Sequence, residues 1–396
     1  MRAVRRQPGV GRLLYVQYTN PAAYPPLQHS SRIMARNGWE VLFLGTGAVG
    51  AGGLSFPAHQ RIHVRCLRFS VSGWRQWLSY PLFCLWVLGW MLHWRPSRVY
   101  VSDYLACPIG LLLTFIPGVQ VIYHEHDSPA PADGDARRQI CLRTRRWLAH
   151  RATVCVLPNH ARAARFASQV GGAPNILCVW NCPSQDEVTP LRPRSDDPTL
   201  WVHFHGSIVP ARLPPSVLSA LAKLPDNVKL RVIGYETVGH AGYVNRLKAA
   251  ACQLGLDDRI EFVGPTSRQE LLQWARRSHV GLCFIPKVAA SVDDAAMVGA
   301  SNKPFDYLAN GMPLVVTDLA EWRSVYVTPG YARACDPDDP DAIAAALQWF
   351  VAHPVERWAM GERGRKRILD DWNYERQFAP VCEQLGGPRV TSFADA

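Results

Sequence analysis

The chain has 396 residues, which is more than one ordinary domain and suits two domains of the common α/β size. Hydrophobic residues make up 48% of it, so a sizeable core can be buried and wholesale disorder is excluded. The formal net charge of +11 is carried mostly by arginine and favours anionic partners, namely nucleic acid, phospholipid headgroups or phosphorylated small molecules. The charge alone does not choose among these three classes.

Eleven cysteines occur without any Cys-x-x-Cys pair, and most of them sit inside apolar runs. This pattern excludes the usual zinc-ligand spacing and predicts buried free thiols in a reducing compartment. The first residues, Met-Arg-Ala-Val-Arg-Arg, are charged but have no apolar run behind them, so we do not expect a secretory signal. The sequence therefore predicts a cytoplasmic protein.

The longest uncharged stretch, residues 76–94, is almost long enough to cross a bilayer. It contains Pro81, Gly89 and His93, and a strand-like run follows it closely. Three interpretations stay open: a membrane span, a helix with one face in the core and an aromatic face on a membrane surface, and a plain buried helix.

Apolar strand-like runs alternate with amphipathic helical stretches through most of the chain. Continuous apolar strands separated by helices predict a parallel sheet that is covered on both faces. In the first half the expected strands are 13–18, 40–44, 63–67, 99–102, 120–124, 153–157 and 176–180, with helices at 27–37, 108–115, 136–150 and 160–169.

Residues 181–199 are rich in proline and charge and have no periodicity, which is typical of a domain linker. The alternation then restarts. The expected strands are 200–205, 228–233, 260–263, 280–284 and 313–317, with helices at 214–224, 243–254, 268–278, 304–310, 340–353, 355–371 and 374–385.

We therefore expect two doubly wound, Rossmann-like parallel-sheet domains. Residues 1–183 form the first, 184–199 the linker and 200–372 the second, while the last helix, about 374–386, packs back on the first domain and 387–396 form a flexible tail. The carboxyl ends of the strands of both domains are expected to face an inter-domain cleft, where a ligand would bind.

A first candidate site lies where strand 200–205 turns into a helix. Gly206 and Ser207 allow a tight turn, and Arg212 with the amides of the helix N-terminus favours a diphosphate. A second lies at the ends of the next two strands, where Gly234 permits close approach of a ligand and a flat base could lie against Phe262, with the backbone of Val263 reading its edge.

A third candidate site is the run Asn302-Lys-Pro-Phe-Asp-Tyr-Leu-Ala-Asn-Gly-Met-Pro. Lys303 and Asp306 lie about one helical turn apart. A carboxylate at a helix N-terminus can accept both hydroxyls of a ribose, and a lysine beside it can meet a phosphate. The run, with Asn302 as its first residue, thus predicts a nucleotide-binding helix over 304–310.

Together, the run from Ser301 to Thr317, the turn at Gly206 and the segment Leu256-Asp-Asp-Arg-Ile-Glu-Phe-Val-Gly resemble the C-terminal domain of the GT-B glycosyltransferases, most closely the retaining group 1 (family 4-like) class. The resemblance covers about 200–372 well and is fainter in the first half. It implies a GT-B fold with an N-terminal acceptor-binding domain and a C-terminal nucleotide-sugar-binding domain.

For the nucleotide, the resemblance implies that Arg212 and Lys303 meet the diphosphate, that Asp306 binds the ribose, and that Phe262 and Val263 read the base. The sequence departs from the family at its first acidic position, which falls on Val298.

For the transferred sugar, the resemblance places His126, in the turn His124-Glu-His-Asp127, at a strand end that faces it. In a retaining enzyme His126 would position the sugar, whereas in an inverting one His126, Glu125 or Asp127 are candidate bases. Our catalytic candidates are His126 and Asp127.

The leading hypothesis is a glycosyltransferase that moves a sugar from a nucleotide-diphosphate sugar, with UDP favoured over GDP, to a glycan or lipid-linked acceptor. We expect retention and neither cofactor nor metal. Contact with anionic membrane through the basic stretch 137–151 is a further expectation. The alternatives are a nucleotide-sugar epimerase on the same fold and a non-catalytic anion-binding or nucleic-acid-binding protein, although no nucleic-acid-binding motif accompanies the charge.

Overall fold

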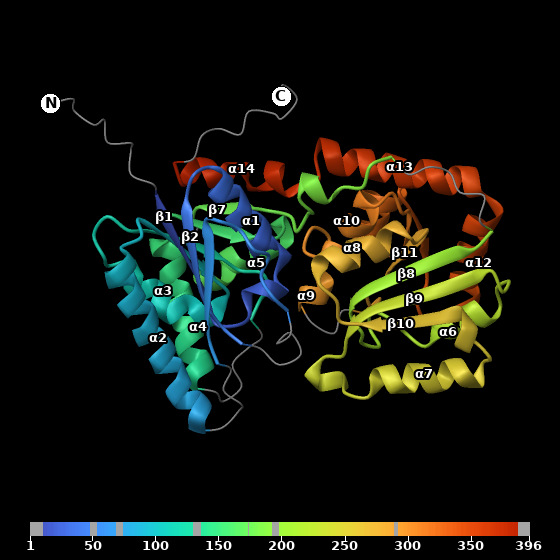
Figure 1. Ribbon diagram of the computed structural model, residues 1–396, viewed down its shortest axis with the longest axis horizontal. Coiled ribbons are helices and arrows are strands. Elements are labelled where there is room, and N and C mark those ends of the chain that lie inside the picture. Colours follow the sequence, from blue (N-terminus) through green and yellow to red (C-terminus); the bar gives the residue numbers. More distant parts are fainter. Residues whose placement is uncertain are drawn as a thin grey trace. The chain divides into compact units, whose positions relative to one another are not determined.

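The computed structural model describes residues 11–47, 54–68, 74–129, 136–172, 174–191, 198–288 and 292–386 (Figure 1). The chain forms two compact units, one of residues up to 180 together with those from 374 onward, and one of residues 181–373. Each unit is an α/β structure around its own parallel sheet, and each is described by itself. The predicted fold class is confirmed.

The first unit holds a seven-stranded parallel sheet in the order β3-β2-β1-β4-β5-β6-β7. The strands are short, mostly apolar runs that are buried, apart from the two edge strands: β3 is largely exposed and β7 is half-buried. The strands are β1 (Arg12–Gln17), β2 (Glu40–Thr46), β3 (Ile62–Leu67), β4 (Arg98–Ser102), β5 (Gln120–His124), β6 (Val154–Leu157) and β7 (Ile176–Cys178).

Helices cover both faces of this sheet. One face packs against α2 (Trp74–Trp94), α3 (Cys107–Leu113), α4 (Ala136–Arg151) and α5 (His160–Val170). The other packs against α1 (Pro25–Arg36) and the last helix, α14 (Tyr374–Gln384). The return of α14 to the first unit agrees with its apolar spacing, because Tyr374, Phe378 and Val381 all enter the core.

The second unit repeats this architecture with six parallel strands in the order β10-β9-β8-β11-β12-β13. They are β8 (Leu200–Ser207), β9 (Val228–Tyr235), β10 (Ile260–Gly264), β11 (Val280–Cys283), β12 (Leu314–Thr317) and β13 (Ala332–Cys335). The last of these was not expected from the sequence, because Ala-Arg-Ala-Cys is neither long nor continuously apolar.

One face of the second sheet packs against α6 (Ser216–Ala222), α7 (Tyr243–Gln253) and α12 (Pro340–Ala352). The other side carries α8 (Arg268–Arg276) and α10 (Asn302–Ala309), and α13 (Pro354–Asp370) packs on α10. Two short α-helices, α9 (Val292–Ala295) and α11 (Ala320–Trp322), also belong to this unit.

The segment that the sequence marks as a linker begins as an ordered part of the second unit. Asn181 donates from its side chain to the Ala300 carbonyl at 2.6 Å, and Thr189 Oγ1 donates to Asn310 Oδ1 at 2.6 Å. Residues 192–197 of the expected linker and the expected tail 387–396 lie outside the described residues.

The uncharged stretch forms the long helix α2, which has Pro81 within it. Phe83, Val87 and Met91 on one side of α2 are buried in the core of the first unit. Among the described residues, none of the helices is both long enough and apolar enough to span a bilayer.

We predict that Phe378→Ala lowers the free energy of unfolding by about 3–5 kcal/mol, because it empties a fully buried position between α14 and the sheet. Urea unfolding followed by tryptophan fluorescence measures this. Val355→Ala, at a half-exposed position in α13, is the matched control and should change stability by less than about 0.5 kcal/mol. An equal effect of the two substitutions would contradict the packing role of α14.

Candidate functional site

The strand order of the second unit reverses at its first strand. From β8 the chain builds outward through β9 and β10, and then returns to place β11 on the other side of β8. In parallel α/β sheets this reversal opens a crevice beyond the carboxyl ends of the two central strands, and ligands bind there. A ligand-binding site is therefore expected at the carboxyl ends of β8 and β11.

Two glycines shape this edge. Gly206 in β8 and Gly234 in β9 lie side by side in the sheet, with φ angles of 108° and 144° that side chains rarely allow. A Cβ atom on Gly234 would lie 1.9 Å from the Gly206 carbonyl oxygen, and one on Gly206 would lie 3.0 Å from Cε of Lys303. The glycine pair thus lets the two backbones approach each other and leaves room for the lysine.

Two cations gather beside the glycines. Lys303 lies in the first turn of α10, directly over Gly206, and burial together with the nearby Arg212 lowers its pKa to about 8. Arg212 follows β8 and forms an ion pair with Asp294 at 2.6 Å. A lysine whose charge is destabilised by burial and by a second cation gains free energy when an anion arrives, so this pair favours an anionic ligand.

The start of α10 adds donors to the same edge. Asn302 is the first residue of α10, and the side chain of the preceding Ser301 makes no capping hydrogen bond. Helix N-termini of this kind favour anions, because their first amides point outward. Ser207 ends β8 beside Tyr235 of β9. The structure thus places Gly206, Ser207, Arg212, Gly234, Asn302 and Lys303 at adjacent strand ends and loops of one sheet edge.

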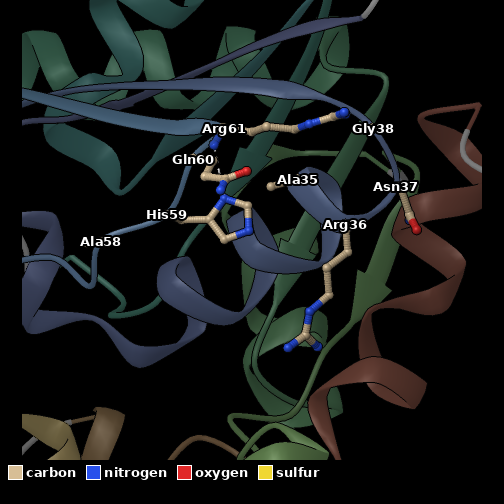
Figure 2. A pocket seen from close by; sticks show the side chains of 8 residues that line it. All are labelled: Ala35, Arg36, Asn37, Gly38, Ala58, His59, Gln60 and Arg61. Atoms are coloured by element: carbon tan, nitrogen blue, oxygen red, sulfur yellow. Dashed lines mark hydrogen bonds between the residues drawn. The ribbon is translucent and has the colours of Figure 1, made fainter.

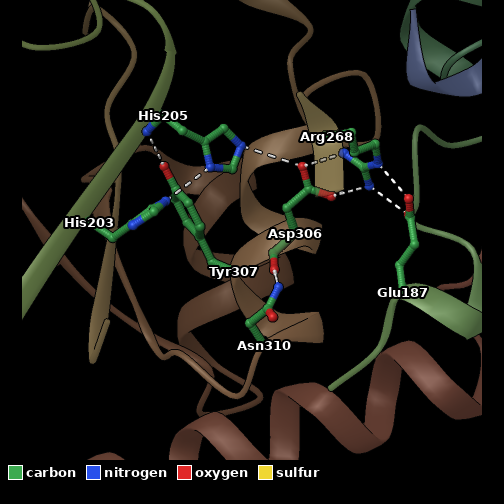
Figure 3. A network of polar contacts seen from close by, with 7 residues as sticks. All are labelled: Glu187, His203, His205, Arg268, Asp306, Tyr307 and Asn310. Atoms are coloured by element: carbon green, nitrogen blue, oxygen red, sulfur yellow. Dashed lines mark hydrogen bonds and ion pairs between the residues drawn. The ribbon is translucent and has the colours of Figure 1, made fainter. Parts of the chain in front are cut away.

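Asp306 has a different environment from the one expected. Its side chain is buried, and Arg268 donates two hydrogen bonds to it, at 2.9 and 3.2 Å (Figure 3). His205 Nε2 lies 3.4 Å from the same carboxylate. Arg268 also donates two hydrogen bonds to Glu187, at 2.6 and 2.7 Å. These partners hold the pKa of Asp306 far below its ordinary value.

The polar network continues inward from Asp306. His205 and His203 are 3.3 Å apart through their ring nitrogens, and His203 lies 3.1 Å from Ser278 Oγ. Burial lowers the pKa of both histidines, so both imidazoles are neutral at pH 7. The Tyr307 hydroxyl accepts a hydrogen bond from the His205 backbone amide at 3.0 Å.

The expected start of the helix at Pro304 is corrected, whereas ribose binding by Asp306 stays a prediction. We expected a helix over 304–310, but α10 begins at Asn302, so Asp306 is its fifth residue and faces inward. Arg268 and His205 engage both carboxylate oxygens, which leaves Asp306 as the anchor of α10 in this structure.

Phe262 and Val263 lie on the edge strand β10, which is separated from β8 by β9. Phe262 packs partly against the core, with Lys248 Nζ 5.5 Å from its ring centre. The register between β9 and β10 shifts after Phe262, so Gly264 rather than Val263 lies opposite Ile233. The reading of a base by the backbone of Val263 stays a prediction.

In the first unit, the expected catalytic residues follow β5. His126 is buried, and burial lowers its pKa to about 4, so its imidazole is neutral at pH 7. Asp127 is exposed, 3.7 Å from Arg162. Glu125 has different neighbours. Its carboxylate accepts hydrogen bonds from Arg145 at 2.5 and 2.7 Å and from the Tyr123 hydroxyl at 2.6 Å. Glu125 is thus a structural partner, which removes it from the candidate bases.

Sequence reasoning missed two residues beside these sites. Arg268 carries no local signal, because its partners Glu187 and Asp306 are distant in the sequence. Asp103 does have a signal, since it is a lone acid directly after an expected strand. Its carboxylate accepts from the backbone amide of His126 at 3.0 Å and from Gln17 Nε2 at 3.3 Å.

A separate open pocket of about 890 Å³ lies at the opposite, amino edge of the first sheet, where α1 leads into β2 (Figure 2). Arg36, His59 and Arg61 line it, and burial with the neighbouring arginines lowers the pKa of His59. Figure 2 shows the two guanidinium groups pointing in different directions, so they do not converge on one ligand. The strand-end sites remain the better candidates.

Comparison with known proteins gives two family matches. A family of proteins described as "Glycosyl transferase 4-like domain" matches residues 27–182, and one described as "Glycosyl transferase-like" matches residues 215–383. The first match lies almost wholly in the first unit and the second mostly in the second unit, and together they cover most of the chain.

Among curated proteins, the chain is similar to the lipopolysaccharide core biosynthesis mannosyltransferase LpcC of Rhizobium leguminosarum bv. viciae, with 25% identity over 42% of this chain and 44% of LpcC. It is also similar to a GDP-mannose-dependent alpha-(1-6)-phosphatidylinositol monomannoside mannosyltransferase of Mycolicibacterium smegmatis, with 24% identity over 62% of this chain and 65% of the relative. The chain thus aligns with less than two thirds of each relative's length.

Among solved structures, the fold is similar to that of Anabaena HepE in complex with UDP and glucose, with a TM-score of 0.69, 16% identity, and coverage of 96% of this chain and 100% of HepE. Two parallel-sheet Rossmann-like units of this kind define the GT-B class. The chain belongs to the group 1 (family 4-like) glycosyltransferases of that class.

We predict that Asp306→Asn lowers the free energy of unfolding by about 3–5 kcal/mol, because it breaks a buried ion pair with Arg268. Thermal and urea unfolding measure this without any ligand. Asp341→Asn breaks an exposed pair with Lys223 and is the matched control, with an expected change below about 1 kcal/mol. If Asp306→Asn leaves stability unchanged and abolishes nucleotide binding, the anchor role is wrong and the result supports the ribose role.

Proposed function

We propose that this protein transfers a sugar from a nucleotide-diphosphate sugar to a glycan or lipid-linked acceptor, and that the second unit holds the nucleotide. The observation that carries the proposal is the placement of Lys303 and Arg212 beside the Gly206–Gly234 pair, at the strand reversal. Family membership supports the reaction class.

The chemistry needs what this edge offers. As the bond from the sugar to the diphosphate breaks, negative charge builds on the leaving group, and preorganised cations and amides stabilise it. Lys303, Arg212 and the first amides of α10 can supply that stabilisation without a metal ion. We propose a retaining transfer, in which the leaving phosphate takes the acceptor proton and neutral His126 orients the sugar.

UDP is the favoured nucleotide and GDP the second. The similarity to HepE, whose structure holds UDP and glucose, supports the first, and the GDP-mannose-dependent relative supports the second. The proposed acceptor class, a glycan or a lipid-linked glycan, follows from LpcC, a lipopolysaccharide core mannosyltransferase, and from the phosphatidylinositol mannoside relative.

We predict that one of UDP and GDP raises the melting temperature, and that Lys303→Met weakens its binding about ten- to a hundredfold, as expected for a lost charge-assisted hydrogen bond. Isothermal titration measures the affinity. Lys223→Met, which removes an exposed lysine of the same unit, should leave it unchanged. Equal affinity of the wild type and Lys303→Met, or no change in melting temperature with either nucleotide, would contradict the proposal.

The affinity should also depend on pH. The pKa of Lys303 is about 8 in the free protein, and a bound diphosphate must raise it because the anion favours the ammonium form. Binding therefore takes up protons near pH 8, and affinity is highest below pH 8 and falls as the pH rises above it. Titrations from pH 7 to 9 in buffers of different ionisation enthalpy test this, and the dependence should vanish in Lys303→Met.

The epimerase alternative predicts an isomerised nucleotide sugar without any acceptor. Analysis of donor incubated with the protein alone, by anion-exchange chromatography, separates the two reactions. Isomerised donor would replace the transferase proposal.

We also propose that the first unit docks on an anionic phospholipid surface. Exposed leucines follow one stripe of α2, at Leu78, Leu82, Leu85 and Leu92. On the same side of the sheet, α4 exposes Ile140 and Trp147 between arginines. None of α2, α3 and α4 contains an acidic residue. Apolar side chains interleaved with arginine suit a headgroup layer.

We predict that the protein sediments with phosphatidylglycerol vesicles and not with phosphatidylcholine vesicles at the same salt. Leu85→Glu and Arg143→Glu should each weaken this binding about tenfold or more, because one removes apolar insertion and the other reverses a charge. Val355→Glu, at a half-exposed position of α13, is the control. A dimer in solution that is lost on Leu85→Glu would instead assign the surface to a second copy.

A further inference from the structure

Three buried polar side chains connect Arg231 of β9 with Asp306 of α10. Arg231 Nη1 donates to Ser278 Oγ at 3.1 Å, and Ser278 Oγ lies 3.1 Å from His203 Nδ1. His203 Nε2 lies 3.3 Å from His205 Nδ1, and His205 Nε2 lies 3.4 Å from Asp306 Oδ2 (Figure 3). All five residues are buried. We call this row, from Arg231 to Asp306, the histidine bridge.

The two ends of the histidine bridge fix the direction of its hydrogen bonds. A guanidinium can only donate, and an ionised carboxylate can only accept. Burial lowers the pKa of both histidines, so each is neutral at pH 7 and carries one ring proton. His205 must therefore place its proton on Nε2, toward Asp306, and accept at Nδ1. His203 must then donate from Nε2 and accept at Nδ1, which takes the hydroxyl proton of Ser278.

The opposite direction is less favourable. The Ser278 hydroxyl could donate to the Trp274 carbonyl instead, at 3.0 Å, and His203 would then donate from Nδ1. The Trp274 carbonyl does not need this proton, because it already accepts from a backbone amide at 3.1 Å. In the reversed bridge the bare Nε2 of neutral His205 would face the carboxylate of Asp306, and two lone pairs would meet without a proton between them. Hydrogen bonding thus selects one tautomer for each histidine.

The histidine bridge and Arg268 together tie Asp306 to both ends of α8. Arg268 is the first residue of α8 and donates to Asp306 directly, whereas Ser278 follows the end of α8 and reaches Asp306 through the two histidines. Loss of one donor from such a buried row leaves its neighbours without a proton to share, which is costly. The row therefore holds the Asp306 carboxylate in one orientation.

His205 links the histidine bridge to the glycine turn of β8. It directly precedes Gly206, and Lys303 lies over that glycine. Helix α10 contacts His205 twice, because Tyr307 accepts its backbone amide at 3.0 Å and Asp306 faces its ring. Loss of the imidazole would leave the Tyr307 contact in place, so α10 would stay attached to β8 while its distance from Gly206 changed.

We propose that His205 is a positioning residue for the nucleotide. Its Nε2 proton, held toward Asp306 by the histidine bridge, sets how far α10 lies from β8 and therefore where Lys303 is placed. This inference rests on the proposed function and adds to it residues that do not touch the ligand. Neither histidine acts as a base, and no covalent bond forms or breaks in this role.

The first experiment locates the ring protons of the wild type without any ligand. In protein that contains ¹⁵N-labelled histidine, a bare ring nitrogen resonates far from a protonated one. The signals of the two histidines are assigned from their loss in His203→Gln and His205→Gln. At pH 8 both histidines should carry their proton on Nε2 and be bare at Nδ1. A proton on Nδ1 of either histidine would overturn the proposal, because the bridge would then not donate toward Asp306.

The second experiment tests the positioning role with a pair of variants at His205. His205→Gln keeps an N–H donor close to the place of Nε2, whereas His205→Leu keeps only the bulk. His205→Leu should weaken the binding of UDP or GDP, whichever the wild type binds, about fivefold or more, and His205→Gln should retain most of the affinity. His353→Gln, at a half-buried histidine between α12 and α13, is the control and should bind as the wild type does. Equal weakening by the two His205 variants would overturn the proposal.

A double-mutant cycle tests whether His205 acts through Lys303. Once Lys303→Met is present, His205→Leu should weaken nucleotide binding by less than about twofold, because the group that His205 places is gone. An undiminished loss in that background would show that His205 acts independently of Lys303 and would overturn the proposal. The histidine signals need no nucleotide, so failure of the histidine bridge is distinct from failure of nucleotide binding.

Discussion

The second unit depends on one arginine that two carboxylates share. The guanidinium of Arg268 forms ion pairs with Asp306 of α10 and with Glu187, which lies in the segment before β8. All three side chains are almost fully buried. Such a buried charge is tolerable only because its fork-shaped donors are matched by two bidentate acceptors. The contact fixes the rotation of α10 about its axis, and with it the direction in which Lys303 leaves the helix.

The same contact divides the charges of this unit into an inner and an outer set. The inner set, Arg268 with Asp306 and Glu187, is saturated and carries one net negative charge. Neutral His205 and His203 continue it inward without adding charge. The outer set consists of Lys303 and Arg212, and Arg212 forms an ion pair with Asp294. A diphosphate bound at this outer edge would bring negative charge beside both cations.

The sequence predicted most of the fold, because its strands are continuous apolar runs and its helices have one apolar face. It failed where these signals are weak. The strand Ala332–Cys335 is too short and too polar to stand out, and α10 begins two residues earlier than Pro304 suggested. For the site, glycines and cations at strand ends could be found, because their role follows from local backbone geometry. Arg268 could not, since its partners become neighbours only after folding.

The two units use the same edge of the same topology in opposite ways. In the second unit, Gly206 and Gly234 remove side chains so that backbones and cations can approach a ligand. At the equivalent reversal of the first unit, Asp103 occupies a glycine-like backbone conformation and brings a carboxylate to the edge. One edge therefore gathers two cations, whereas the other presents a carboxylate. The two edges thus differ in charge without any difference in fold, because the strand order around β8 matches that around β1.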